Sequence, residues 1–232
     1  MRLVIVGNGK MGRAITELAK DRGHVIHTVV TRTENAGGRA LTAERLAGAE
    51  VALEFTRPDS VATNLEHLIA AGIPTVTGTT GWGDELPRIT TLVQSRGGSL
   101  LHASNFSVGV HLFFRSALAL ARCFRGREEF GVSIVEEHHA TKLDAPSGTA
   151  LQLQRQLWSE EPGRRFPITS LRSGDTPGTH TVSYESPYET ITLSHVTRSR
   201  QVFAAGALAA AEWLPGRAGV FTFDDMLFGS TP

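Results

Sequence analysis

The chain opens with the stretch Arg2-Leu-Val-Ile-Val6-Gly7-Asn-Gly9-Lys-Met-Gly12, from which the rest of the architecture can be worked out. Its first five residues form a short apolar run typical of a buried strand, and residues 13–20 predict a helix. Between them stands the glycine pattern G-x-G-x-x-G. In this setting the first glycine permits a tight turn, the second lets a pyrophosphate approach the backbone, and the third packs the helix on the strand. The stretch therefore predicts a dinucleotide-binding turn made of Gly7, Asn8, Gly9, Lys10, Met11 and Gly12.

Short β-rich runs and helical runs alternate over the first hundred residues, as in a parallel sheet covered by helices. The expected strands are 2–6, 25–31, 51–55, 74–77 and 99–102, and the expected helices are 11–22, 42–47, 59–71 and 84–96. Ligands of such a sheet lie beyond the carboxyl ends of its strands. We therefore expect the loops that follow the strands to surround the cofactor, through Thr56, Gly78, Thr79, Thr80, Ala103, Ser104, Asn105 and Phe106.

The end of the second strand bears on which dinucleotide is bound. An acidic residue there would bond the ribose hydroxyls of NADH, whereas an arginine accommodates the additional phosphate of NADPH. Here the strand ends in Thr31-Arg32, and the nearest acid is Glu34. The planar guanidinium of Arg32 suits a phosphate group, so the sequence favours NADPH over NADH. The alternative is that Arg32 is a solvated surface charge.

The pattern changes after about residue 104. A long apolar helix is expected at 110–123, followed by a strand at 130–136, a helix at 149–158, strands at 168–172, 180–184 and 190–195, an Ala-rich helix at 203–214 and a final segment at 220–228. Strands separated by such turns predict a mixed sheet. We therefore predict an α/β protein, with a Rossmann-type parallel-sheet domain over 1–104, which the segment 198–232 joins, and a second α+β domain with a mixed sheet over 105–197.

The run from Glu136 to Ala150, EEHHATKLDAPSGTA, carries the chemistry. His138 and His139 can exchange protons near neutral pH, and Lys142 adds a compact positive charge. The residues that follow read as a turn opening a helix, where free N–H groups around Gly148 and Thr149 favour an anion. This combination predicts a site for an anionic substrate that receives a proton.

Each residue of this run also has a structural interpretation. Ser147 can cap the helix, Asp144 can form a local turn bond, and single histidines are commonly structural. The clustering of two adjacent histidines, a lysine and a helix-start glycine favours the functional interpretation for the set.

Composition argues against several classes of function. The 232-residue chain has 23 basic and 23 acidic residues, so no overall field draws it to nucleic acid or to a membrane surface. The single cysteine, Cys123, lies in an apolar stretch, and no Cys/His spacing indicates zinc. The apolar start is too short for a signal peptide or a membrane span. We therefore expect a cytoplasmic protein without a metal site.

These motifs resemble those of the 4-hydroxy-tetrahydrodipicolinate reductase (dihydrodipicolinate reductase) family nearly end to end. The resemblance rests on the glycine turn, Glu54-Phe-Thr-Arg-Pro58, Gly78-Thr-Thr-Gly81, Ala103-Ser-Asn-Phe-Ser-Val-Gly109 and, above all, the histidine run, with Arg172, Gly174, Gly178 and His180 at the family's spacing. Family members often carry an acidic residue where Thr31 stands, and the segment between the second and third strands is shorter here than is usual.

The resemblance implies hydride transfer from NADPH or NADH to a small cyclic imine dicarboxylate, in lysine and diaminopimelate biosynthesis. It assigns His138 as general acid, Lys142 as a second proton donor, and His139, Gly148 and Thr149 to a substrate carboxylate. Arg200 is expected to assist them, although Arg198 is equally near. The resemblance also implies a homotetramer built on the second domain. Two alternatives are another NAD(P)-dependent oxidoreductase acting on a keto or imino acid, and a non-catalytic dinucleotide sensor.

Overall fold

The computed structural model describes residues 1–229, which fold into two compact units. Unit 1 combines Met1–Ser107 with the segment that starts at Gln201, and unit 2 comprises Val108–Arg200. Unit 1 is thus discontinuous in sequence, and unit 2 is an insertion between its fifth strand and its last helices. No helix among the described residues combines the length and the apolar content that crossing a bilayer requires.

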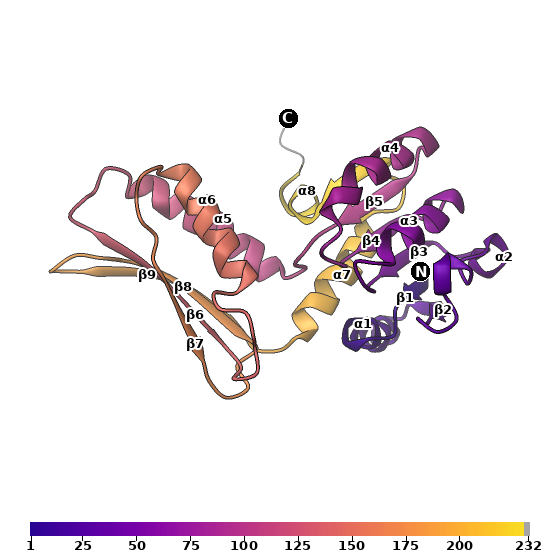
Figure 1. Ribbon diagram of the computed structural model, residues 1–232, viewed down its shortest axis with the longest axis horizontal. Coiled ribbons are helices and arrows are strands. Elements are labelled where there is room, and N and C mark those ends of the chain that lie inside the picture. Colours follow the sequence, from indigo (N-terminus) through magenta and orange to yellow (C-terminus); the bar gives the residue numbers. More distant parts are fainter. Residues whose placement is uncertain (230–232) are drawn as a thin grey trace. The chain divides into compact units, whose positions relative to one another are not determined.

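The centre of unit 1 is a parallel six-stranded sheet in the order β10-β5-β4-β3-β1-β2 (Figure 1). Its strands are β1 (Arg2–Val6), β2 (Val25–Val30), β3 (Val51–Glu54), β4 (Thr75–Thr77), β5 (Ser99–His102) and β10 (Gly219–Thr222). The inner strands are apolar and buried on both faces because helices cover both sides of the sheet. The last strand, β10, pairs with β5, so the end of the chain completes the sheet of unit 1.

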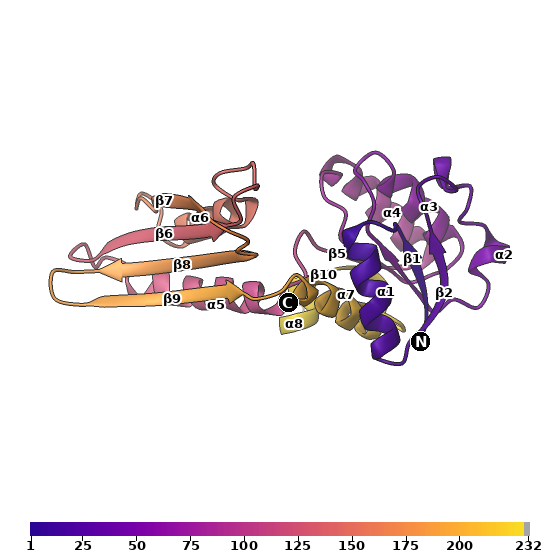
Figure 2. The ribbon, with the colours of Figure 1, turned by 90° about the horizontal axis from the view of Figure 1, so that it is seen from below.

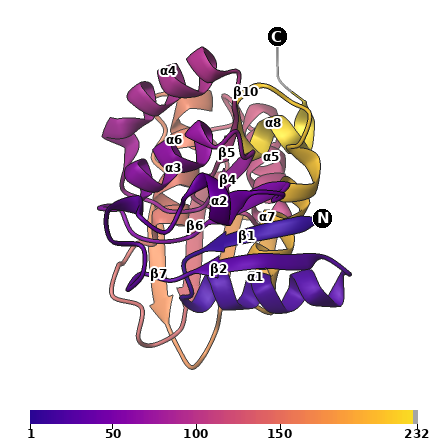
Figure 3. The same ribbon diagram turned by 90° about the vertical axis from the view of Figure 1, so that its right-hand side faces the viewer.

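Helices pack on both faces of this sheet (Figure 3). Helices α1 (Lys10–Asp21) and α7 (Gln201–Trp213) pack on the face to which Leu3 and Ile5 point. On the other face lie α3 (Val61–Ala70), against Val4 and Val6, and α4 (Leu86–Arg96). The shorter elements of unit 1 are η1 (Ala36–Gly38), α2 (Ala43–Leu46), η2 (Gly83–Glu85) and α8 (Phe223–Phe228).

Unit 2 is a four-stranded mixed sheet in the order β7-β6-β8-β9 (Figure 2). Strands β6 (Gly131–His138) and β7 (Ile168–Arg172) are parallel, whereas β8 (Gly178–Glu185) and β9 (Thr190–Thr197) run antiparallel to their neighbours. Helices α5 (Val108–Cys123) and α6 (Gly148–Glu160) bury the apolar face of the sheet. The opposite face exposes hydroxyl side chains, among them the bonded pairs Thr181–Ser194 and Ser183–Thr192.

The predicted fold class, a Rossmann-type parallel sheet together with a mixed-sheet α+β unit, is confirmed. The differences from the expected element bounds are local. Strand β6 continues to His138 instead of ending at 136, because its alternation of buried residues persists through Glu136 and His138. The helix expected at 84–96 is divided into η2 and α4, with Pro87 in the first turn of α4, where a missing N–H carries no penalty.

Candidate active site

The glycine turn after β1 has the geometry of a dinucleotide-binding turn. Gly7 has a φ of 103°, and a Cβ on it would lie 2.2 Å from the carbonyl oxygen of Phe55. A Cβ on Gly12 would lie 1.9 Å from the carbonyl oxygen of Gly7, so this residue lets α1 pack against the turn. Gly9, in contrast, faces open space, with nothing within 4 Å of such a Cβ. The turn is therefore closed where it packs and open where a phosphate would approach.

A pocket of about 490 Å³ adjoins this turn. Its walls come from the carboxyl ends of three neighbouring strands, as expected for ligands of a doubly wound sheet. The lining includes Gly7, Asn8, Gly9, Arg32, Asn35, Thr56, Arg57 and Asn64. Lys10 and Met11 belong to the first turn of α1, with Lys10 exposed and Met11 packed on the core of unit 1.

The end of β2 presents Arg32 to the pocket and turns Glu34 away from it. The Glu34 carboxylate accepts a hydrogen bond from the N–H of Thr31 at 2.7 Å and pairs with Arg45 at 3.1 Å. The hydrogen bond from Arg45 holds the pKa of Glu34 below its usual range. Arg32 lines the pocket and forms no ion pair among residues 1–229. The nearest acid is thus already neutralised by an arginine outside the pocket, and the free cation at this strand end is Arg32.

The loops after β4 and β5 line a smaller hollow of about 160 Å³, which includes Thr79, Thr80, Ala103 and Ser104. Gly78 precedes it, and a Cβ there would lie 2.1 Å from the ring of Phe55. Two of the expected cofactor residues have side chains engaged elsewhere. Asn105 accepts the N–H of Ser107, and Phe106 is 2% exposed and packs edge-on against Phe223.

A buried carboxylate joins two of the loops at the strand ends. Glu54, at the end of β3, accepts hydrogen bonds from Thr77 and Thr79 at 2.7 Å, from Asn64 at 3.1 Å and from Thr56. Thr79 in turn accepts the N–H of Thr56 at 2.8 Å. Burial raises the pKa of Glu54 although the four donors oppose that effect. We refer to this set, Glu54, Thr56, Asn64, Thr77 and Thr79, as the Glu54 cage.

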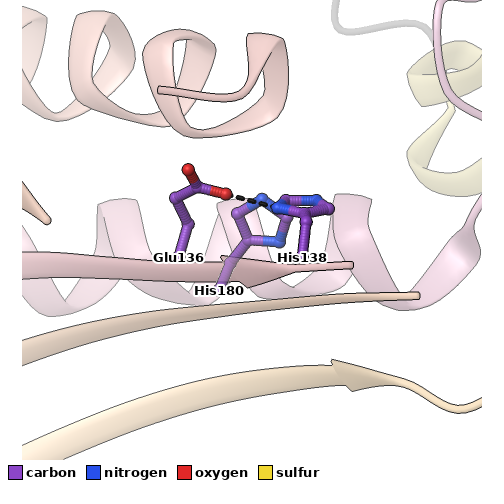
Figure 4. Close-up of side chains that lie close together, drawn as sticks. All are labelled: Glu136, His138 and His180. Carbon is purple, nitrogen blue, oxygen red and sulfur yellow. Dashed lines mark hydrogen bonds and ion pairs between the residues drawn. The ribbon is translucent and has the colours of Figure 1, made fainter. Parts of the chain in front are cut away.

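In unit 2, the first histidine of the run is the last residue of β6 and points to the helix-covered face. Glu136 lies two positions earlier on the same face, and its carboxylate contacts Nδ1 of His138 (Figure 4). The other carboxylate oxygen pairs with Nη1 of Arg172 at 2.8 Å. Burial alone would raise the pKa of Glu136, but donors that include Arg172 and His138 outweigh it and hold that pKa below its ordinary value.

His180, on the neighbouring strand β8, lies beside His138. The two rings meet edge to face, with centroids 5.2 Å apart. Nε2 of His180 lies 3.3 Å from the hydroxyl of Ser147, and burial lowers the pKa of His180 to about 4. Burial also lowers the pKa of His138, an effect that Glu136 opposes. At neutral pH, His180 is therefore an uncharged neighbour of the paired His138 and Glu136.

Lys142 follows in the loop after β6. Its ammonium group is 2.7 Å from the carboxylate of Asp144, and this hydrogen bond holds the pKa of Asp144 below its usual range. The Lys142 side chain is 23% exposed, whereas that of Asp144 is 58% exposed. An exposed carboxylate can be displaced by a competing anion, so the Lys142 cation remains available to an anionic ligand.

Helix α6 begins at Gly148, directly after this loop. Ser147 caps it, accepting the N–H of Ala150 at 3.2 Å, as the structural interpretation of that residue expects. A Cβ on Gly148 would meet nothing within 4 Å, so the space beside the helix start is open. Gly148 and Thr149 lie in the first turn of α6, where helix N–H groups without intrahelical partners and the helix dipole favour negative charge.

The second histidine of the run contacts Arg200. Nη2 of Arg200 donates to Nε2 of His139 at 3.1 Å, and Nδ1 of His139 is 2.8 Å from the hydroxyl of Thr141. Of the two arginines that the sequence left open, the structure therefore brings Arg200 to the histidine run.

Glu136, His138 and His180 each offer one possible metal-ligand atom, and these atoms lie within 4.8 Å of one another. The carboxylate, however, already carries a guanidinium on one oxygen and an imidazole on the other. A metal ion would have to displace both. The arrangement is therefore one in which a buried carboxylate contacts one imidazole and one guanidinium.

Sequence reasoning assigned no role to Glu136, Arg172 or His180. A signal for Glu136 was present, since alternation along β6 puts Ile134, Glu136 and His138 on one buried face. The partners come from β7 and β8, and their register was not readable from the sequence.

Known proteins are similar in sequence to this chain over nearly its whole length. Residues 1–106 match the family described as dihydrodipicolinate reductase, N-terminus, and residues 109–227 match its C-terminal counterpart. The chain is 37% identical to the 4-hydroxy-tetrahydrodipicolinate reductase of Christiangramia forsetii, with 98% of each chain covered. It is 34% identical to the enzyme of the same name from Chromobacterium violaceum, with 97% of each covered.

A solved structure shares the fold. It is the dipicolinate-bound dihydrodipicolinate reductase from Paenisporosarcina sp. TG-14, which is 21% identical, with a TM-score of 0.81 and coverage of 98% of this chain and 100% of that one. Together with the two family matches and the curated relatives, these similarities establish that the chain belongs to the dihydrodipicolinate reductase family.

Proposed function

We propose that the protein reduces 4-hydroxy-tetrahydrodipicolinate to tetrahydrodipicolinate with hydride from a nicotinamide dinucleotide, in the lysine and diaminopimelate pathway. Hydride and one proton are consumed, and the hydroxyl group of the substrate leaves as water. The observation that carries the proposal is the cluster in unit 2 in which His138, Lys142 and the start of α6 lie within one short segment. A proton donor, a cation and an anion site are what reduction of a cyclic dicarboxylate requires.

Unit 1 is the dinucleotide-binding part of this proposal. The open face of Gly9, the crowding at Gly7 and Gly12, and the adjacent 490 Å³ pocket fit a pyrophosphate at the start of α1. When bound there, the nicotinamide supplies the hydride. The loops at Gly78–Thr80 and Ala103–Phe106 complete the proposed cofactor site.

NADPH is the preferred cofactor in this proposal. Arg32 is the free cation at the end of β2, and a planar guanidinium can bind a phosphate through two hydrogen bonds. The carboxylate of Glu34, which would repel a phosphate, is neutralised by Arg45. NADH is also expected to bind, because Thr31 and Arg32, which line the pocket at the end of β2, can form hydrogen bonds with a ribose hydroxyl.

His138 is the proposed proton donor. Its Nδ1 is occupied by Glu136, which leaves Nε2 as the ring nitrogen from which a proton can pass. Lys142 provides the second donor and stabilises negative charge on the substrate. The substrate carboxylates bind the N–H groups of Gly148 and Thr149 and the pair formed by His139 and Arg200.

The sheet of unit 2 is the proposed assembly surface of a homotetramer. Its outer face carries a cross-strand row of Leu171, Glu137, Thr179 and Val196. Leu171 is 46% exposed and Val196 is 57% exposed. Packing of this face against a second copy of the chain would remove both apolar side chains from water. Sedimentation or light scattering would test the oligomeric state, and a monomer at micromolar concentration would contradict it.

The decisive test of the reaction is NADPH oxidation by the purified protein with and without enzymatically generated 4-hydroxy-tetrahydrodipicolinate. Oxidation only in its presence is expected. If another keto or imino acid supports faster turnover, the protein is a related oxidoreductase with a different substrate. A protein that binds NADPH but never oxidises it would be a sensor, a function for which the His138 and Lys142 cluster has no physical use.

A further inference from the structure

The sheet of unit 2 assembles a charged group around His138 from three different strands. His138 is in register with Arg172 of β7, and Glu136 is in register with His180 of β8. Residues opposite one another in a sheet point to the same face, so all four side chains meet on the helix-covered side. Figure 4 shows Glu136, His138 and His180 rising together from β6 and β8.

We propose that Glu136 is a positioning residue that fixes the proton-donating form of His138, with Arg172 holding the carboxylate in place. This inference rests on the proposed function and adds to it a role for a pair of residues outside the substrate site. The contact between Glu136 and Nδ1 of His138 selects the tautomer in which Nδ1 carries a hydrogen. The proton delivered to the substrate then leaves from Nε2.

Arg172 gives the carboxylate its second partner. Nη1 pairs with Glu136 at 2.8 Å, and Nη2 donates to the backbone carbonyl of Asp144. Arg172 thereby ties the loop that carries Lys142 to the strand that carries His138. Glu136 is fully buried, and an unpaired carboxylate at that position would carry a large desolvation penalty. The guanidinium therefore favours the anionic form of Glu136 and lowers the pKa of this carboxyl group.

The other face of His138 is kept clear. Gly178 is the first residue of β8, and a Cβ at Gly178 would lie 3.0 Å from Nε2 of His138. His180 stands edge-on beside the ring and is uncharged at neutral pH. Any side chain at position 178 would crowd the nitrogen that donates the proton, and glycine avoids this.

Within the described residues, the charged groups that act on the pKa of His138 include Glu136 on its own strand, Arg172 on β7 and Lys142 in the following loop, whereas His180 on β8 is an uncharged neighbour. Burial lowers the pKa of His138, and Lys142 and Arg172 act in the same direction. Glu136 is the group that opposes them. Without its negative charge, the imidazolium form of His138 is present only at lower pH.

The variant that tests this is Glu136→Gln. In this variant the amide oxygen of the glutamine would face Arg172. The amide NH₂ group would then face Nδ1 of His138 and disfavour the imidazolium form of that ring. We expect kcat at neutral pH to fall by on the order of 100-fold, as for loss of a general acid, with NADPH affinity unchanged. The rate should recover in part as the pH is lowered through a range in which the wild-type rate is flat.

Glu185→Gln is the matched control. Glu185 is an exposed residue on β8 opposite Gly131, at the far end of the sheet from His138, and should show wild-type kinetics. If Glu136→Gln keeps the wild-type pH profile, or loses activity equally at every pH, Glu136 is only a structural residue and the inference is wrong.

A measurement on the unmodified protein decides the point even if Glu136→Gln does not fold. In protein labelled with ¹⁵N-histidine, the neutral His138 ring should carry its hydrogen on Nδ1. A hydrogen on Nε2 would overturn the inference. The NMR measurement needs no substrate and is therefore independent of turnover. Absence of turnover in the wild type would refute the proposed function. A hydrogen on Nε2 would refute only the role of Glu136.

Discussion

Arg200 donates a hydrogen bond to the Nε2 atom of His139 across 3.1 Å, although 61 positions separate them in the sequence. The guanidinium of Arg200 carries a positive charge and has only donor groups. Arg200 therefore places a cation beside the histidine run, in addition to Lys142.

Arg200→Met should raise the substrate KM by about tenfold or more, because a charge-assisted contact to a carboxylate is lost. The change in kcat should be smaller. Steady-state kinetics at saturating NADPH would measure both. Arg198→Met is the matched control, since Arg198 is also exposed and forms no hydrogen bond with His139 within residues 1–229. A larger effect at Arg198 would reassign the role.

Lys142→Ala should lower kcat by on the order of 100-fold and also raise the substrate KM, because one ammonium serves both proton donation and charge stabilisation. Asp144→Asn is informative beside it. Removing the partner charge leaves Lys142 in place, so most of the activity should remain. Stopped-flow single-turnover rates would separate the chemical step from binding, and wild-type rates for Lys142→Ala would remove this residue from the mechanism.

Gly9→Ala and Gly12→Ala should fail in different ways. The space at Gly9 is open and its φ is −69°, so alanine there should change the free energy of unfolding by only about 0.5 kcal/mol while weakening NADPH binding. Alanine at Gly12 collides with the backbone of Gly7 and should destabilise unit 1 by about 1–3 kcal/mol. Thermal unfolding and NADPH fluorescence titration distinguish the two. Equal loss of stability in both variants would contradict the assigned geometry.

Arg32→Ala should raise the KM for NADPH by about tenfold and leave the KM for NADH unchanged, because only NADPH carries the additional phosphate. Initial rates with each cofactor measure this selectivity. Arg39→Ala is a useful comparison, because Arg39 is occupied with the backbone carbonyl of Glu34 at 3.1 Å and does not line the pocket. Equal effects of Arg32→Ala on the two cofactors would exclude a phosphate contact.

His180 makes stability depend on pH. Its pKa is about 4 in the folded protein, against an ordinary value of 6.5, so the unfolded chain binds more protons between these values. The stabilising effect of neutral His180 is therefore complete above pH 6.5 and is lost as pH falls towards 4, by roughly 3 kcal/mol in all. Urea unfolding from pH 4 to pH 8 should show a steeper decline in the wild type than in His180→Gln. Parallel curves would show that His180 is not buried as a neutral ring.

The elements of the fold were largely predictable, because hydrophobic periodicity and glycine turns are local signals. The parallel strands and their helices match the expected positions closely, whereas the strands of unit 2 extend beyond the expected bounds: β6 to His138, β8 from Gly178 to Glu185 and β9 to Thr197. Glu137 and His138, expected after the strand, remain in β6. His138 is buried there beside His180 of β8 and in contact with Glu136, and the neighbour from β8 could not be read from the local sequence.

Candidate site residues could be predicted only where they lie close together in the sequence. The histidine run and the glycine turn are contiguous, so their residue types could be interpreted directly. Phe106 belongs to the loop after β5, as the sequence predicts, but the packing of its ring against Phe55 and Phe223 could not be read from the sequence. The orientation of Glu34 away from the pocket depends likewise on Arg45, eleven positions away.

The Glu54 cage connects the loop after β3 to the loop after β4, so the positions of the two loops are coupled. A single carboxylate holds Thr56 of one loop and Thr79 of the other, and Thr79 also receives the backbone N–H of Thr56. Substitutions in the two loops should therefore not act independently on NADPH affinity. Natural or engineered changes in cofactor use that reshape residues 55–57 would have to be accompanied by adjustments at 78–80, so the two segments are expected to diversify as a linked pair.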